Sequence, residues 1–436
     1  MRLHQHRRLC QSIALAFSSL GGIAAMASPN VQGGGSSLIA PAIGAIVNPA
    51  TEIGLFGTAE GSFTYFSVGS GAGQNAFLNN QPTYFGAGVT GTAHFANSDA
   101  ALSTAQLTRY KAGLGATNGP LIQIPYIVTP ITVPVVNGPA VTSTTTPQTT
   151  PGQAHSIALN DDDLCGIFSG KLTNWNQVIN PETTAAYTTN APIKVIYRTD
   201  GSGTTELLTR HLATVCTAVN TAWWATFVDS LTFTASFPGG TVPSNFIAAS
   251  GDSGVRRQLA SYASAGMAAV AYLAPNYTNT FLAPSSTVVK SAGALQLPVA
   301  SLVNAKNTVY YAPTYTNATT ALGNIIPPGI RSYAADPANW AINISGSPPS
   351  GYPISGMSYI ILSQCYSDPV VGTAVHDFLS AHYTNPSFAS IVHGNGFDTV
   401  PTNFQTAISN EFLSNARTWN LDIGNASICT GTVVGR

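Results

Sequence analysis

The sequence predicts an α/β fold with mixed, mostly parallel sheets flanked by helices, and two observations lead to it. Apolar runs typical of short strands alternate with runs of helical spacing along most of the chain. At residues 33–38, 69–73 and 201–205, a turn rich in glycine and serine leads into a helix, and the second and third turns follow a predicted strand. This order is typical of parallel sheets whose connecting helices cover the sheet faces.

The most informative of these turns spans residues 198–205, with the sequence RTDGSGTT. Residues 193–197 before it form an apolar run that predicts a buried strand, and residues 206–215 after it have helical spacing. A helix N-terminus has unpaired N–H groups and a partial positive charge, and an arginine beside it adds a planar pair of donors. The turn therefore indicates an oxyanion site; the alternative is a Gly-Ser turn that only caps a helix.

Two further junctions lie nearer the N-terminus. Residues 33–38 form a glycine turn that predicts a helix over 39–43 with Ser37 near its cap. Residues 63–68 alternate as a strand before the turn 69–73. The short strand 93–96 ends close to Asp99, whose ordinary role would be the N-cap of a helix over 100–114.

The remaining elements are less sharply marked. Strands are predicted at 121–128, 131–136, 266–272 and 352–362. Helices are predicted after 161–163 and at 252–263, 370–382 and 406–419. Residues 139–154 read as a loop, and residues 275–355 have little periodicity.

Composition excludes some function classes. Only 8% of the 436 residues are charged, against about 25% in a typical protein, and the net charge is −1. The 16 Lys and Arg residues are scattered, which excludes a nucleic-acid-binding surface. With 41 Gly and 28 Pro, the chain is predicted to be rigid, rich in loops and extracytoplasmic.

The first 27 residues predict a cleaved signal peptide. A positive start containing Arg2, Arg7 and Arg8 precedes a small-apolar stretch over 13–26, and an A-x-A site predicts cleavage after Ala27. No later apolar run reaches the roughly 20 residues that a membrane helix needs. We therefore expect an exported protein, periplasmic or secreted, without membrane insertion.

The mature chain keeps four cysteines, at positions 165, 216, 365 and 429. An even number in an exported protein predicts two disulfides, for which three pairings exist; sequential pairing closes loops of moderate length. The spacing has no C-x-x-C pair, and the histidines lack metal-ligand spacing, so we expect no metal and no cofactor.

Residues 251–254, Gly-Asp-Ser-Gly, match the nucleophile motif of chymotrypsin-like proteases. The match is superficial, because the segment runs into a predicted helix and the chain alternates strands with helices, whereas that fold is all-β. We assign no catalytic residue.

Several motifs in order resemble one family. They are GGGSSL at 33–38, VGS at 68–70, FANSD at 95–99, IFSGKLTNW at 167–175, RTDGSGTT at 198–205 and YPISG at 352–356. Together they resemble the phosphate-binding proteins of the bacterial phosphate ABC transporter, PstS-like proteins, and their DING-protein relatives. The resemblance covers nearly the whole mature chain, and the motifs at 167–175 and 198–205 are its most specific parts.

The resemblance implies a phosphate site assembled from two groups of residues that lie far apart in the sequence. The phosphate ligands carried over are Ser37, Leu38, Ser70, Asp99, Arg198, Ser202, Gly203 and Thr204, with Asp200 holding the arginine. The two disulfides resemble those of the DING branch, and we predict them as Cys165–Cys216 and Cys365–Cys429.

The implied fold is the two-lobed type II periplasmic-binding-protein, or venus-flytrap, fold. Lobe I would comprise residues 31–126 plus 278–436, and lobe II residues 127–277. The implied function is to clamp inorganic phosphate between the lobes for uptake or scavenging, as a monomer, with a phosphate ABC transporter permease as a partner. The alternative is a secreted DING-type alkaline phosphatase that hydrolyses phosphomonoesters.

Overall fold

The computed structural model describes residues 28–344 and 346–436. The predicted signal peptide, residues 1–27, and its cleavage point after Ala27 lie outside the described residues.

The largest of the three sheets has six strands in the order β13-β4-β12-β3-β1-β2. The bounds are β1 Asn30–Gly35, β2 Ser62–Ser67, β3 Phe95–Ser98, β4 Leu121–Pro130, β12 Ser355–Ser363 and β13 Asp398–Thr399. Strand β1 pairs in parallel with β2 and β3, whereas β12 runs antiparallel to β3 and β4. Helices α3 (Ser70–Leu78) and α12 (Pro369–Thr384) pack against this sheet.

The two long central strands carry the core of this sheet. Every residue of β4 and of β12 is buried, as expected for strands covered on both faces. Pro125 lies inside β4, where it cannot donate a ladder hydrogen bond. The register of the β4–β12 pair shifts beside it, between Ser358 and Tyr359, and such a bulge accommodates the missing donor. The two strands predicted at 121–128 and 131–136 are thus one long strand and the short β5.

A second sheet has four strands in the order β5-β9-β7-β8. The bounds are β5 Val135–Val136, β7 Lys194–Arg198, β8 Phe246–Ala249 and β9 Ala269–Ala271. Strand β7 is parallel to both β8 and β9. Helix α7 (Gly203–Val215) follows β7, and α8 (Gly251–Ser264) follows β8 and packs on β7 and β9.

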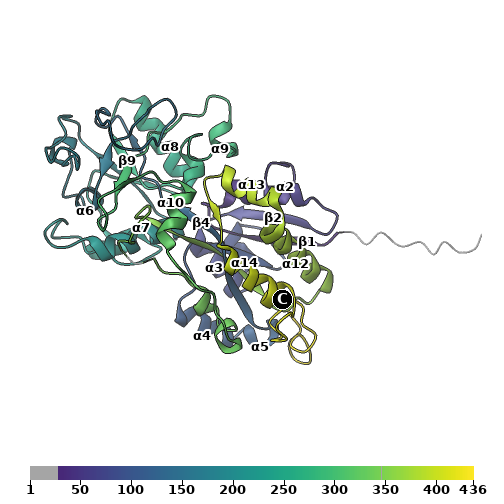
Figure 1. The fold of residues 1–436 in the computed structure, drawn as a ribbon. Coiled ribbons are helices and arrows are strands. Elements are labelled where there is room, and N and C mark those ends of the chain that lie inside the picture. The colour runs from purple at the N-terminus through teal and green to yellow at the C-terminus, as the bar shows by residue number, and fades with distance from the viewer. Residues whose placement is uncertain (1–27, 345) are drawn as a thin grey trace, which may run out of the picture.

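Figure 1 shows these sheets in two bodies, with β9 and α8 in one, β1, β2 and α12 in the other, and β4 between them. A third, three-stranded sheet pairs β6 (Ala158–Leu159) with β10 (Ser301–Val303), which also pairs with β11 (Tyr310–Tyr311). It joins a segment predicted for lobe II to one predicted for lobe I. The lobe boundaries stay a prediction.

The other helices complete the fold. They are α1 Ala40–Ile43, α2 Glu52–Phe56, α4 Thr104–Ala112, α5 Gly115–Asn118, α6 Asp161–Ser169, α9 Thr287–Lys290, α10 Tyr315–Leu322, α11 Arg331–Ala334, α13 Pro386–Gly394 and α14 Thr402–Ile408, which continues as a π-helix over Ser409–Leu413. Short 3-10 turns lie at Pro82–Phe85, Trp175–Gln177, Phe233–Ser236, Pro238–Gly240, Pro275–Tyr277 and Pro337–Trp340.

Three helix predictions are corrected. Helix α4 does not begin at Asp99, because Ser103 forms a capping box with Gln106 and starts the helix at Thr104. Residues 37–39 form a turn, and α1 begins only at Ala40, so Ser37 does not cap it. Residues 414–419 lie outside the helix predicted at 406–419.

Two disulfides join distant segments. Cys165 in α6 is bonded to Cys216 at the end of α7, and Cys365 after β12 is bonded to Cys429. They span 51 and 64 residues, and in the chain-entropy picture a loop of that size stabilises the folded chain by about 4 kcal/mol. Among the described helices, none is long and apolar enough to cross a membrane.

Candidate functional site

The candidate site lies where parallel strands of the two sheets end. Ser36 and Ser37 directly follow β1, and Asp99 follows β3, the parallel neighbour of β1. In the four-stranded sheet, Arg198 ends β7, and Asp252 comes three residues after its parallel neighbour β8. The carboxyl ends of parallel strands meet at one sheet edge, which is the ordinary place for a ligand site in α/β folds.

Hydrogen bonds show that these two edges face each other. The Arg198 guanidinium donates to the hydroxyl of Ser37, with Nη2 and Oγ 2.9 Å apart. The N–H of Gly71 donates to the carbonyl of Gly201 at 2.9 Å. The fold therefore brings together two groups of predicted site residues that lie far apart in the sequence.

The two edges approach each other closely at Gly203. A Cβ built on this residue would lie 2.5 Å from Cβ of Asp99 and 2.7 Å from Oγ of Ser70. Real side chains do not tolerate such distances, so the contact requires glycine. The start of α7 is thus packed directly on Asp99.

Arg198 is held by two carboxylates. Its Nε donates to Asp200 Oδ1 at 2.8 Å and its Nη2 to Asp200 Oδ2, while Nη1 donates to Asp252 Oδ2 at 2.6 Å. The side chain is 1% exposed. Burial lowers the pKa of Arg198, but Asp252 and Asp200 outweigh burial, and the pKa is raised above its usual value. Asp200 holds the arginine as predicted.

Asp99 is buried and protonates more readily than an ordinary aspartate. Burial raises its pKa to about 6, although a hydrogen bond from Ser36 opposes this rise. Ser36 Oγ donates to Oδ1 at 2.7 Å and to Oδ2 at 2.8 Å. The hydroxyl of Ser70 accepts the Asp99 N–H at 3.2 Å and lies 3.5 Å from Oδ2. A carboxyl in this setting can accept a proton from a ligand.

The start of α7 adds further donors. Ser202 caps the helix by accepting from the Thr205 N–H at 3.1 Å, while its own N–H donates to the Leu231 carbonyl. The N–H groups of Gly203 and Thr204 lie in the first turn of α7, where the helix itself offers them no acceptor. Thr204 Oγ1 is buried and has no hydrogen-bond partner among the described residues. Such an orphaned hydroxyl is rare unless a ligand or water completes it.

Leu38 is one of the predicted donors at the β1 end. Leu38 is fully buried, and its N–H donates to Ser36 Oγ at 3.1 Å. Its carbonyl accepts from Asn276 at 2.8 Å. In this arrangement the Leu38 N–H is engaged within the protein.

Ser36 and Asp252 belong to the site and were not predicted. Ser36 stands beside Ser37 in the same turn, so only its contact with Asp99, 63 positions later, reveals its role. Asp252 belongs to the Gly-Asp-Ser-Gly motif, in which Ser253 is exposed whereas Asp252 is fully buried. Its place just after β8 becomes informative only once β8 is known to run parallel to β7.

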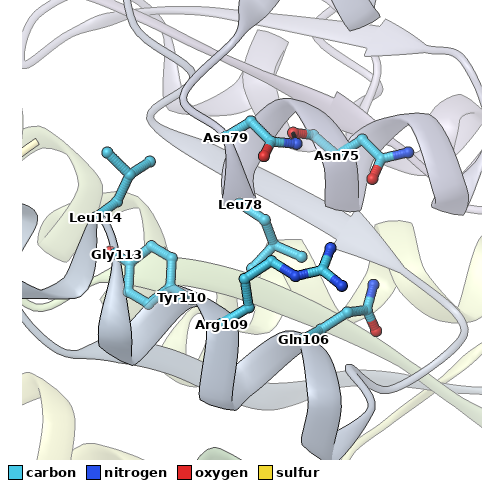
Figure 2. Close-up of a pocket in the computed structure, with 8 residues that line it drawn as sticks. All are labelled: Asn75, Leu78, Asn79, Gln106, Arg109, Tyr110, Gly113 and Leu114. Atoms are coloured by element: carbon cyan, nitrogen blue, oxygen red, sulfur yellow. Dashed lines mark hydrogen bonds between the residues drawn. The ribbon is translucent and has the colours of Figure 1, made fainter.

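A cavity elsewhere contains none of the predicted site residues. It measures about 260 Å³ and lies between α3 and α4, lined by Asn75, Leu78, Asn79, Gln106, Arg109, Tyr110, Gly113 and Leu114. In Figure 2 the Arg109 side chain extends along the space between the two helices. Over residues 28–344 and 346–436, no group of three or more His, Cys, Asp or Glu side chains is placed to hold a metal ion.

Comparisons with known proteins identify the family of the chain. Residues 23–380 match the family model described as a PBP superfamily domain. The chain is 34% identical over 370 residues to alkaline phosphatase L of Pseudomonas aeruginosa strain PAO1, which covers 84% of this chain and 86% of that protein. It is 30% identical over 378 residues to a phosphate-binding protein from an unknown prokaryotic organism, covering 84% and 92%.

Among solved structures, the fold is similar to that of a high affinity periplasmic phosphate-binding protein, PfluDING, bound with phosphate. The TM-score is 0.72 at 31% identity, and the match covers 93% of this chain and 99% of that one. The predicted α/β fold class is confirmed.

Proposed function

This chain belongs to the phosphate-binding proteins of the PBP superfamily, and we propose that it binds inorganic phosphate between two halves of the molecule for uptake or scavenging. The observation that carries this proposal is that Asp99 packs against the start of α7 while Arg198 contacts Ser37 in the turn after β1, with both side chains 1% exposed. A guanidinium and a helix N-terminus attract an oxyanion. A buried carboxylate beside them repels it, unless the anion carries a proton.

Asp99 therefore selects the protonation state of the ligand. Phosphate near neutral pH carries at least one proton, which its hydroxyl can donate to Asp99. Sulfate carries none, so it would leave the buried carboxylate unpaired and facing a negative charge. Sites that lose a required hydrogen bond in this way reject an analogue by about 10⁴-fold or more.

The proposed ligand set draws on both sheets. Ser37, Leu38, Ser70 and Asp99 would contribute from the six-stranded sheet, and Arg198, Ser202, Gly203 and Thr204 from the β7–α7 junction. The unpartnered hydroxyl of Thr204 supports this set. We keep lobe I as 31–126 plus 278–436 and lobe II as 127–277, so that the chain crosses the hinge twice and closure brings the two groups together.

Titration calorimetry of the purified, phosphate-free chain tests the proposal. We expect this protein to bind one phosphate per chain, with saturation. A folded, phosphate-free preparation that binds no phosphate would contradict the proposal. Gly329→Ala is a matched control for the site variants described below, because a Cβ at Gly329 meets nothing within 4 Å.

A second candidate function is hydrolysis of phosphomonoesters. The observation that favours it is the similarity to alkaline phosphatase L over 84% of the chain. The same donors could stabilise negative charge that develops on a transferring phosphoryl group. Turnover of p-nitrophenyl phosphate that co-purifies with the chain and disappears in Arg198→Ala would support this activity. Turnover that survives this substitution would come from a contaminant and remove the candidate.

The proposal also concerns location. The PfluDING relative is periplasmic, and we propose the periplasm or the cell exterior for this chain, as a monomer that delivers phosphate to a transporter permease. Mass spectrometry of the exported protein tests cleavage after Ala27: a mature chain starting at Ser28 is expected, and an intact Met1 would contradict it.

A further inference from the structure

The hydroxyl of Ser37 is fully committed inside the protein. It donates its one proton to Asp252 Oδ2, at 2.5 Å. It also accepts from Arg198 Nη2 at 2.9 Å and from the N–H of Asp252 at 3.3 Å. A serine hydroxyl has one donor and two acceptor sites. As arranged here, Ser37 has no proton left for a phosphate oxygen.

Arg198 is almost as fully committed. A guanidinium has five N–H donors. Two go to Asp200, one to Ser37 Oγ and one to Asp252 Oδ2, so one N–H on Nη1 is left without a partner among the described residues. Both Ser37 and Arg198 are thus restrained by the same oxygen, Oδ2 of Asp252.

Asp252 is rigidly placed to do this. It is the second residue of α8 and fully buried, and its Oδ1 accepts from the Ala274 N–H at 3.3 Å. Its contact with Ser37 joins a residue after β8 to a residue after β1, across the two sheets. The carboxylate therefore occupies donors from both edges at once, as an oxyanion ligand would.

We propose that Asp252 is an internal competitor of phosphate that sets the affinity of the clamp. This inference rests on the proposed function. In this structure Asp252 accepts the Ser37 proton and one Arg198 N–H, and phosphate must take these donors over or bind without them. To bind phosphate, each of these donors must first give up its hydrogen bond to the charged Asp252, and this loss offsets part of the binding free energy. Asp252 therefore weakens phosphate binding and speeds phosphate release.

The test is a double-mutant cycle on phosphate affinity. Asp252→Ala removes the competitor while Asp200 still holds Arg198, and we expect the phosphate Kd to fall about tenfold, the size of one charged hydrogen bond. Ser37→Ala should raise Kd by a smaller factor in the wild-type background, where Asp252 competes for the Ser37 proton, than in the Asp252→Ala background. In the Asp252→Ala background the same change should raise Kd about tenfold.

Asp229→Ala is the charge-matched control, since Asp229 pairs with Arg210 and is half-exposed. Its Kd should stay within about twofold of wild type. Should Asp252→Ala fold poorly in a thermal melt, Asp252→Asn serves instead, because it keeps the shape and loses the charge; its Kd should also fall.

The outcomes separate the two proposals. A wild type that binds phosphate, with Asp252→Ala and Asp252→Asn binding less tightly, would show that Asp252 only supports Arg198 and would overturn the competition. Equal effects of Ser37→Ala in both backgrounds would overturn it as well. A wild type without phosphate affinity would overturn the proposed function, and this inference with it.

Discussion

Ser36 Oγ lies 2.7 Å from Oδ1 and 2.8 Å from Oδ2 of Asp99, so a single hydroxyl fixes the orientation of the buried carboxyl group. The bond favours the charged form of Asp99 and opposes the effect of burial on its pKa. Ser36 therefore adjusts whether Asp99 is ready to accept a proton from the ligand. The turn after β1 thus acts on the site through Ser36 as well as through Ser37.

Ser36→Ala should raise the pKa of Asp99 further above about 6 and weaken phosphate binding near neutral pH. A protonated Asp99 has lost the acceptor that the ligand's proton needs. Carbon-detected NMR of the Asp99 carboxyl in the phosphate-free protein measures the pKa directly. The exposed Ser253→Ala is the control, and an unchanged Asp99 pKa in Ser36→Ala would remove Ser36 from this role.

Gly203→Ala should weaken phosphate binding by about tenfold or more, because its Cβ would lie 2.5 Å from Cβ of Asp99 and keep the two edges apart. Gly329→Ala, whose Cβ has open space, should bind like wild type. Calorimetry of the two variants side by side makes the comparison, and equal affinities would mean that the edges need not approach so closely.

Asp99 should make the ligand-free protein more stable in mild acid. Its pKa is about 6 in the fold against 3.8 in the reference state, so the folded chain takes up a proton that the unfolded chain does not. The stabilisation is complete below about pH 3.8 and is lost as the pH rises through about 6. Raising the pKa of Asp99 from 3.8 to about 6 corresponds to about 3 kcal/mol.

This linkage is measured by urea unfolding at several pH values in wild type and Asp99→Asn. The difference in unfolding free energy between the two should shift by about 2.5 kcal/mol, in favour of wild type, as the pH falls from 7 to 4. A difference that does not change with pH would show that Asp99 has an ordinary pKa in the fold.

Arg198→Ala should cost both affinity and stability. Phosphate loses a charged donor, worth about 1.5–3 kcal/mol for each hydrogen bond, and binding should weaken by several kcal/mol. Asp200 and Asp252 are left without their partner, and breaking a buried pair costs about 3–5 kcal/mol of folding free energy. Calorimetry and urea unfolding of the variant measure the two losses; unchanged affinity would remove Arg198 from the site.

Much of this arrangement could be predicted because it follows from local patterns. The run at 198–205 predicts a strand end, a turn and a helix start, and the structure has β7 and α7 in those places. The Asp99 segment was harder, because its helix could begin at Asp99 or at Ser103, and the capping box with Gln106 decided for Ser103.

The missed residues depend on contacts between distant segments. Asp252 and Ser37 are 215 positions apart and touch only because β8 and β1 end at facing edges. No local pattern around Asp252 reports this contact, and the Gly-Asp-Ser-Gly motif drew attention to the exposed Ser253 instead. A sequence pattern can thus assign donors to a site without showing which of them the protein already uses.

We propose that Asp99 and Arg198 together bind a phosphate that carries a proton. Competition calorimetry with phosphate and sulfate, on wild type and Asp99→Asn, tests it most directly. We expect wild type to prefer phosphate by about 10⁴-fold or more and Asp99→Asn to lose most of this preference. The same phosphate-to-sulfate preference in both proteins would contradict it.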